Sequence, residues 1–200
     1  MKPLPPQLQA ALQTAARAFH AGDHRRTQTL CLELLRRAGP RPDVLNLKGL
    51  SELHAGQSEA AANSLRAALK LEPRRAELHL NLALAESELA RWRAVKQHAL
   101  EAARLAPQQP RVVYQAARCC RDAQDFATAQ RLADRAAALA PDEPDGWHLK
   151  GSIHLDLGDM SAAKAAFARA VEADPQHARS LALLSSLEKT GTDDTARIGQ

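Results

Sequence analysis

Apolar side chains recur along the chain at intervals of three and four residues, which is the spacing of one face of an α-helix. A clear example is MSAAKAAFARAVEAD, in which Ala163, Phe167 and Val171 form such a stripe. The preceding stretch DGWHLKGSIHLDLGD also has helical spacing, and Gly158-Asp159 between the two stretches is a turn signal. The pattern therefore predicts two helices joined by a short turn.

This pair of helical patterns is repeated with a fixed period. Prolines just beyond the second pattern follow one another at intervals of 34 residues, at Pro73, Pro107, Pro141 and Pro175. An alanine precedes each of them by five residues, at Ala68, Ala102, Ala136 and Ala170. Because proline cannot continue a helix and restricts the residue before it, each proline marks the join between two helical hairpins.

Small residues occupy an equivalent point on the first helix of each unit, namely Gly49, Ala83, Ala117 and Gly151. A glycine inside a helix costs about 1 kcal/mol relative to alanine, so we expect close packing of the two helices to compensate for it. The composition agrees, because 45% of the residues are apolar but only 3% are aromatic. Alanine and leucine must therefore build most of the core.

The chain resembles an array of tetratricopeptide repeats, whose 34-residue unit follows the pattern W-x₂-L-G-x₂-Y…A-x₃-F…P. The resemblance is strongest in residues 144–177, through Trp147, Gly151, Ala163, Phe167, Ala170 and Pro175. Lys150 and His154 replace the usual leucine and tyrosine of this pattern. The resemblance implies an all-α fold, an α-solenoid of antiparallel helix hairpins that forms a right-handed superhelix.

The repeat register divides the chain into about five repeats and a C-terminal cap. We expect an N-terminal extension at 1–7, a divergent repeat at 8–41, repeats at 42–75, 76–109, 110–143 and 144–177, a capping helix at 178–189 and a polar tail at 190–200.

The resemblance also implies a binding surface, because the first helices of such repeats line a concave groove that commonly binds peptides or proteins. The expected groove residues are Asn46, Glu77, Asn81, Arg111, Tyr114, Gln115, Arg118, Arg121 and His148. In the fourth repeat three arginines, a tyrosine and a glutamine share one broad face, and arginine suits carboxylates. We therefore expect the centre of a groove for an acidic or C-terminal peptide segment.

An alternative for this face is that Arg111 and Arg121 pair with Glu77, Asp122 or Asp145 on neighbouring helices. Some repeats of this family bind acidic chaperone tails through a clamp of Lys, Asn, Asn, Lys and Arg. Only Asn81 and Arg111 match that clamp, so this partner is not assigned.

The net charge and the cysteine content bear on which partners and which cellular compartment we expect for the protein. The net charge of +4 is too small to imply nucleic acid, although residues 1–41 are basic. Three cysteines, two of them adjacent, do not suggest a disulfide framework. Neither a signal peptide nor a membrane span is evident, so we expect a cytoplasmic protein.

No catalytic constellation is evident in the sequence. The H-E-x-x-H, G-x-S-x-G and phosphate-loop signatures are absent, and His20/His24 and His148/His154 lack a third ligand at suitable spacing. We expect no enzyme activity in these residues, no cofactor and no metal.

The expected function is a protein-protein interaction scaffold that binds a peptide or protein segment, with self-association left open. One alternative is an N-terminal recognition module of a larger bacterial enzyme, such as a sulfotransferase or glycosyltransferase. A nucleic-acid or membrane-surface binder is a third, disfavoured because aromatic residues are sparse.

Overall fold

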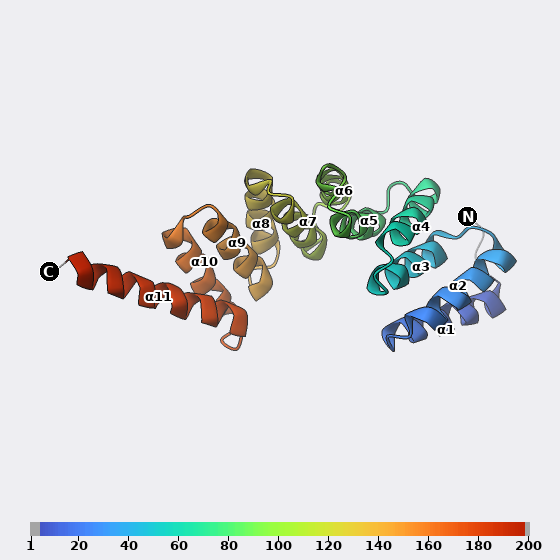
Figure 1. Ribbon diagram of the computed structural model, residues 1–200, viewed down its shortest axis with the longest axis horizontal. Helices are drawn as coiled ribbons and strands as arrows, with labels where there is room; N and C mark the ends of the chain where they lie inside the picture. Colours follow the sequence, from blue (N-terminus) through green and yellow to red (C-terminus); the bar gives the residue numbers. More distant parts are fainter. Residues whose placement is uncertain (1–4, 199–200) are drawn as a thin grey trace. The chain divides into compact units, whose positions relative to one another are not determined.

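The protein is helical throughout the part that a computed structural model describes, which is the backbone of residues 5–198 and the side chains of residues 5–189. This part contains eleven α-helices and no strand (Figure 1). The expected all-α repeat fold is therefore confirmed. Residues 1–4 of the expected extension and 199–200 of the expected tail lie outside the described residues.

The helices belong to two compact units, residues 1–105 and 106–200. The first unit holds α1 (Pro6–His20), α2 (His24–Ala38), α3 (Pro42–His54), α4 (Ser58–Leu71), α5 (Ala76–Glu88) and α6 (Trp92–Leu105). The second holds α7 (Pro110–Asp122), α8 (Phe126–Leu139), α9 (Pro144–Asp156), α10 (Met160–Ala173) and α11 (Ala178–Ile198).

Within each unit, every helical hairpin packs against the next one along the chain. In the first unit α2 contacts α3 and α4 contacts α5, while the first helices α1, α3 and α5 also touch in sequence. In the second unit α8 contacts α9, α7 contacts α9, and α11 packs on α10. Each hairpin thus buries its apolar face against its neighbours, as in other stacked repeats.

Small residues on the first helices allow close contact inside the hairpins. A β-carbon on Gly49 would lie 2.8 Å from Leu65 Cγ, and one on Gly151 would lie 2.6 Å from Phe167 Cε1. Leu65 and Phe167 are fully buried. The two glycines therefore make room for the large side chain that fills each hairpin.

The turn inside each hairpin requires a left-handed backbone at one position. The residues at this position are 34 apart, and their φ values are +75° at Gly22, +73° at Gly56, +53° at Ala90, +57° at Gln124 and +78° at Gly158. Three of the five are glycine, which adopts this conformation without steric cost. The other two hold a side chain in a conformation that L-residues disfavour.

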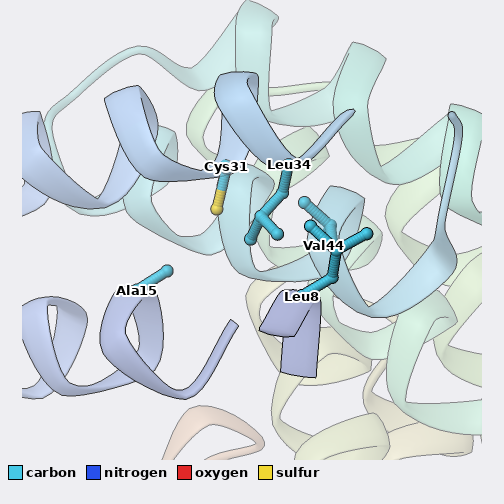
Figure 2. Packing of buried hydrophobic residues seen from close by; sticks show 5 residues of the cluster. All are labelled: Leu8, Ala15, Cys31, Leu34 and Val44. Atoms are coloured by element: carbon cyan, nitrogen blue, oxygen red, sulfur yellow. The ribbon is translucent and has the colours of Figure 1, made fainter. Parts of the chain in front are cut away.

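The N-terminal core joins the first three helices. Leu8 and Ala15 of α1, Cys31 and Leu34 of α2, and Val44 of α3 form one buried cluster (Figure 2). Burial raises the pKa of the Cys31 thiol to about 12, so this cysteine remains a neutral apolar group at physiological pH.

Both ends of the helical region extend further than the sequence pattern indicated. Helix α1 begins at Pro6, inside the expected extension 1–7, since proline is well suited to the first turn of a helix. Helix α11 continues to Ile198, so its backbone runs past the expected capping helix 178–189 into the expected polar tail. No proline follows Lys189, and Gly191 alone costs only about 1 kcal/mol.

Candidate functional site

A cleft of about 510 Å³ lies in the second unit, between the start of α7, the end of α8 and the start of α9. Its lining residues are Pro110, Arg111, Tyr114, Gln115, Ala136, Ala140, Glu143, Asp145 and Gly146. Three of the expected groove residues, Arg111, Tyr114 and Gln115, therefore lie together in one wall of the cleft.

Helix α7 positions this wall because it has one polar and one apolar side. Tyr114 and Gln115 lie three and four residues after Arg111 and four and three residues before Arg118, and none of the four is fully buried. The other side of the helix is buried in the hairpin core, for example at Val113. The cleft residues are thus presented by a helix whose back is fixed by packing.

The three arginines of α7 differ in their partners. Arg121 Nη2 lies 3.3 Å from Asp156 Oδ1, and its Nε donates to the other carboxylate oxygen. Among the described residues, neither Arg111 nor Arg118 makes an ion pair or a hydrogen bond through its side chain. Arg121 therefore forms an ion pair with Asp156 of a neighbouring helix, whereas the guanidinium groups of Arg111 and Arg118 are available to bind a ligand.

Charged groups around the cleft change the pKa of Tyr114. Burial raises the pKa of this half-buried phenol and the Asp145 carboxylate raises it further, whereas Arg118, Arg179 and Arg121 lower it. Three cationic groups and one anionic group thus act on the tyrosine hydroxyl.

The opposite wall of the cleft is acidic, and one of its carboxylates is already paired. Asp145 Oδ1 lies 2.6 Å from Arg179 Nη2 at the start of α11. His177 Nε2 is 3.4 Å from the same oxygen but makes no hydrogen bond within the described part of the chain. Glu143, at the rim, is exposed to solvent.

His148, also expected in the groove, lies outside the cleft lining and faces α11. Its Nδ1 is 3.0 Å from Ser180 Oγ, and its ring lies beside those of Phe167 and His177. Burial lowers the pKa of His148 to about 4, with Arg179 and His177 acting in the same direction. This histidine therefore joins α9 to α11 as a neutral ring.

The expected groove residues of the first unit form a hydrogen-bonded row of their own. Asn81 Nδ2 donates to Asn46 Oδ1 over 2.8 Å, and Asn46 Nδ2 donates to Glu77 Oε1 over 3.4 Å. Arg75 binds both Glu77 and Asp43. The polar groups of this row are therefore largely used between α3 and α5.

Several of these charged residues occupy the same position in successive repeats. The positions 43, 77, 111, 145 and 179 are each 34 residues apart, and they hold Asp, Glu, Arg, Asp and Arg. Sequence reasoning overlooked the last of these, Arg179, because it lies in the capping helix. It also overlooked Glu143, Gly146 and the α8 residues of the cleft, for which the repeat pattern contains no signal.

Two pairs of histidine side chains are in contact in the first unit, away from the cleft. The rings of His24 and His54 are stacked with centroids 5.3 Å apart, and His79 Nδ1 lies 3.0 Å from His98 Nδ1. Across the described residues, no three His, Cys, Asp or Glu side chains are arranged to hold a metal ion. The described helices also include none that is long and apolar enough to cross a membrane.

Stacked helical hairpins with a 34-residue register define an α-helical repeat protein. Sequence profiles of the tetratricopeptide repeat match residues 46–110 and 144–177. The chain is a tetratricopeptide repeat array, as its sequence pattern predicts.

Known proteins with similar sequence or fold agree with this assignment. A heat shock protein sti1 homolog of Schizosaccharomyces pombe is 32% identical over 81 residues, which are 40% of this chain and 14% of that protein. The structure of Pseudomonas aeruginosa PilF has a TM-score of 0.77 and 19% identity, covering 94% of this chain and 86% of PilF. YrrB, a tetratricopeptide repeat protein with an unusual peptide-binding site, has a TM-score of 0.69 and 13% identity, covering 86% and 88%.

Proposed function

We propose that the protein is an interaction scaffold whose cleft between α7 and α9 binds a carboxylate-bearing segment of a peptide or protein. Tetratricopeptide repeats in general serve protein interaction, and the two sequence profiles place this chain among them. The acidic ligand, the cleft and its residues are the specific part of the proposal.

The observation that carries the proposal is the surplus of cationic groups around Tyr114. Arg118 and Arg111 have no ion-pair partner among the described residues, so binding a carboxylate requires breaking no existing ion pair of theirs. A planar guanidinium can donate two parallel hydrogen bonds to a carboxylate. The Tyr114 hydroxyl is a further donor at the same wall.

The shape of the cleft supports a side chain or chain end as its occupant. Its volume of about 510 Å³ falls within the range of about 300–1,000 Å³ that small-ligand pockets span. Ala136, Ala140 and Gly146 contribute apolar surface, and Gly146 itself is buried. A ligand with an apolar side chain next to its carboxylate fits this combination of surfaces.

The proposal is tested with short fluorescent peptides of three kinds: rich in Asp and Glu, rich in Lys, and uncharged. Each is made with a free and with an amidated C-terminus. We expect fluorescence anisotropy to show tighter binding of the acidic peptides. Arg118→Glu should weaken that binding at least about tenfold, because a hydrogen bond to a charged group contributes about 1.5–3 kcal/mol.

The matched control is Arg131→Glu, which makes the same charge change on an exposed residue of α8 that neither lines the cleft nor acts on Tyr114. It should leave binding of the acidic peptides nearly unchanged. Equal binding of the three peptide classes, or equal losses in the two variants, would reject the proposal.

A further inference from the structure

Asp145 belongs to two parts of the second unit at once. Its carboxylate lines the cleft, and it is also the acceptor for the start of α11. The guanidinium of Arg179 therefore reaches the cleft wall although Arg179 is not a lining residue. No other carboxylate among the described residues combines these two contacts.

The start of α11 is also held in place by hydrogen bonds to the Ser180 hydroxyl, beside this ion pair. Ser180 Oγ lies 2.7 Å from His177 Nδ1 and 3.0 Å from His148 Nδ1, and Ser180 is fully buried. A hydroxyl donates only one hydrogen bond, so at least one of the two ring nitrogens donates to Ser180 Oγ. These bonds connect the first turn of α11 to α9 and set the position of Arg179.

We propose that Arg179 is a specificity-determining residue of the cleft: by neutralising Asp145, helix α11 makes the cleft accept carboxylates, and release of this helix makes it reject them. The inference rests on the proposed function for the choice of ligand. The charge coupling between Arg179, Asp145 and the cleft is independent of any ligand.

Simple electrostatics supports this assignment. With Asp145 paired, the free guanidinium group of Arg111 is the charged group of the α7 wall, and Arg118 adds a second positive charge beside Tyr114 on the same helix. Without Arg179, the Asp145 carboxylate keeps only the His177 ring beside it, and its charge adds to that of Glu143 in the cleft lining, which repels an anionic ligand. The side chains of Arg179 and Asp145 are 63% and 50% exposed, so their pair contributes little to folding and can be removed without unfolding the unit.

The first test needs no ligand, because Tyr114 is the chain's single tyrosine. Its ionisation is followed by the ultraviolet absorbance of tyrosinate. Arg179→Ala should raise the pKa of Tyr114 and Asp145→Asn should lower it, since the first change removes a cation and the second an anion. Arg179→Lys should stay close to the unaltered protein.

Arg131→Ala serves as the matched control, because it removes a cation that lies outside the cleft lining. Far-ultraviolet circular dichroism verifies that each variant remains folded over the titration range. If neither Arg179→Ala nor Asp145→Asn shifts the Tyr114 titration, the charge coupling is absent and the inference fails.

The second test uses the acidic fluorescent peptide. Arg179→Ala should weaken its binding about two- to fivefold, the effect of one partly exposed charge. The double variant Asp145→Asn/Arg179→Ala should bind at least as well as the unaltered protein, because the carboxylate that Arg179 neutralises is gone.

The double variant separates this inference from direct contact between Arg179 and the ligand. If loss of Arg179 weakens binding equally with and without Asp145, Arg179 acts on the ligand itself and the inference is overturned. If no acidic peptide binds to any variant, the proposed function fails, while the tyrosine titration still decides whether α11 controls the cleft charge.

Discussion

Gly151 of α9 lies directly against the ring of Phe167 of α10, and a β-carbon at this glycine would be 2.6 Å from the ring. Gly151→Ala should therefore destabilise the second unit by about 1–3 kcal/mol through overpacking, although alanine favours the helix by about 1 kcal/mol. Urea unfolding followed by the fluorescence of Trp147, in the same helix, measures this change when Trp92 of the first unit is replaced by Phe in both proteins.

A compensating change tests the cause of that loss. Adding Phe167→Leu to Gly151→Ala should recover part of the stability, since the smaller side chain vacates the space of the ring. Gly49→Ala should be milder than Gly151→Ala, because the flexible Leu65 stands in the place of the ring. A double variant less stable than both single variants would contradict the packing explanation.

Ala90 and Gln124 hold the left-handed position of their hairpin turns without being glycine. Because this conformation costs an L-residue about 1 kcal/mol or more, Ala90→Gly and Gln124→Gly should each raise stability by about 0.5–1 kcal/mol. Gly56→Ala should lower it by a similar amount. Thermal unfolding checks the three signs, and stabilisation by Gly56→Ala would refute the strain argument.

Glu86 is a buried carboxylate, 2% exposed, bound to Arg66 over 2.5 Å and to Arg91 over 3.4 Å. Arg66→Met should destabilise the first unit by about 1–3 kcal/mol, because it leaves one carboxylate oxygen poorly compensated. Adding Glu86→Gln should restore part of this loss by removing the buried charge. The exposed Arg93, mutated to Met, is the control. Urea unfolding followed by Trp92 fluorescence gives the comparison when Trp147 is replaced by Phe in all variants.

His148 should make stability depend on pH. Burial lowers its pKa to about 4 in the folded protein against a usual value near 6.5, so the unfolded chain binds the proton more readily. The stability contributed by neutral His148 is complete above about pH 6.5 and is lost as pH falls toward 4. The difference corresponds to at most about 3 kcal/mol, reduced by solvent because the ring is half-buried.

His148→Gln should flatten this dependence. Thermal midpoints at pH 7, 6 and 5 for the unaltered protein, for this variant and for an exposed control, His20→Gln, provide the measurement. In the first unit, burial and His79 lower the pKa of His98, which also reduces stability as pH falls. A residual dependence of the thermal midpoint on pH is therefore expected in all three proteins. An unchanged slope in His148→Gln would show that this histidine is not responsible.

The repeated helices and turns of this fold could be predicted from the sequence, because the same pattern of residues recurs in each repeat. The spacing of Pro73, Pro107, Pro141 and Pro175 marks the joins of the hairpins, and the helical spacing of Arg111, Tyr114 and Gln115 predicts their common face. Both are local properties of the chain. A stack of similar units converts such local patterns directly into tertiary structure.

The choice of partners is not local, and here the sequence was insufficient. Arg121 has several acidic residues within reach of neighbouring helices, and only side-chain packing selects Asp156. The role of Arg179 depends on how the capping helix packs on α10 and brings its first turn to Asp145 of α9, which the weak apolar pattern after Pro175 does not determine. A helix end is equally uncertain where no proline or glycine motif terminates it, as at Ile198.

The position of α11 at the end of the second unit has a dynamic consequence. Detaching α11 breaks contacts with α10 and the polar contacts to α9, whereas detaching α9 breaks contacts on both of its sides. Helices with fewer packing partners open with a smaller free energy, so amide hydrogens of Ala178–Ile198 should exchange with solvent before those of Pro144–Asp156. Since the ion pair of Asp145 opens with α11, an anionic ligand in the cleft should slow this exchange, and the two equilibria are thermodynamically linked.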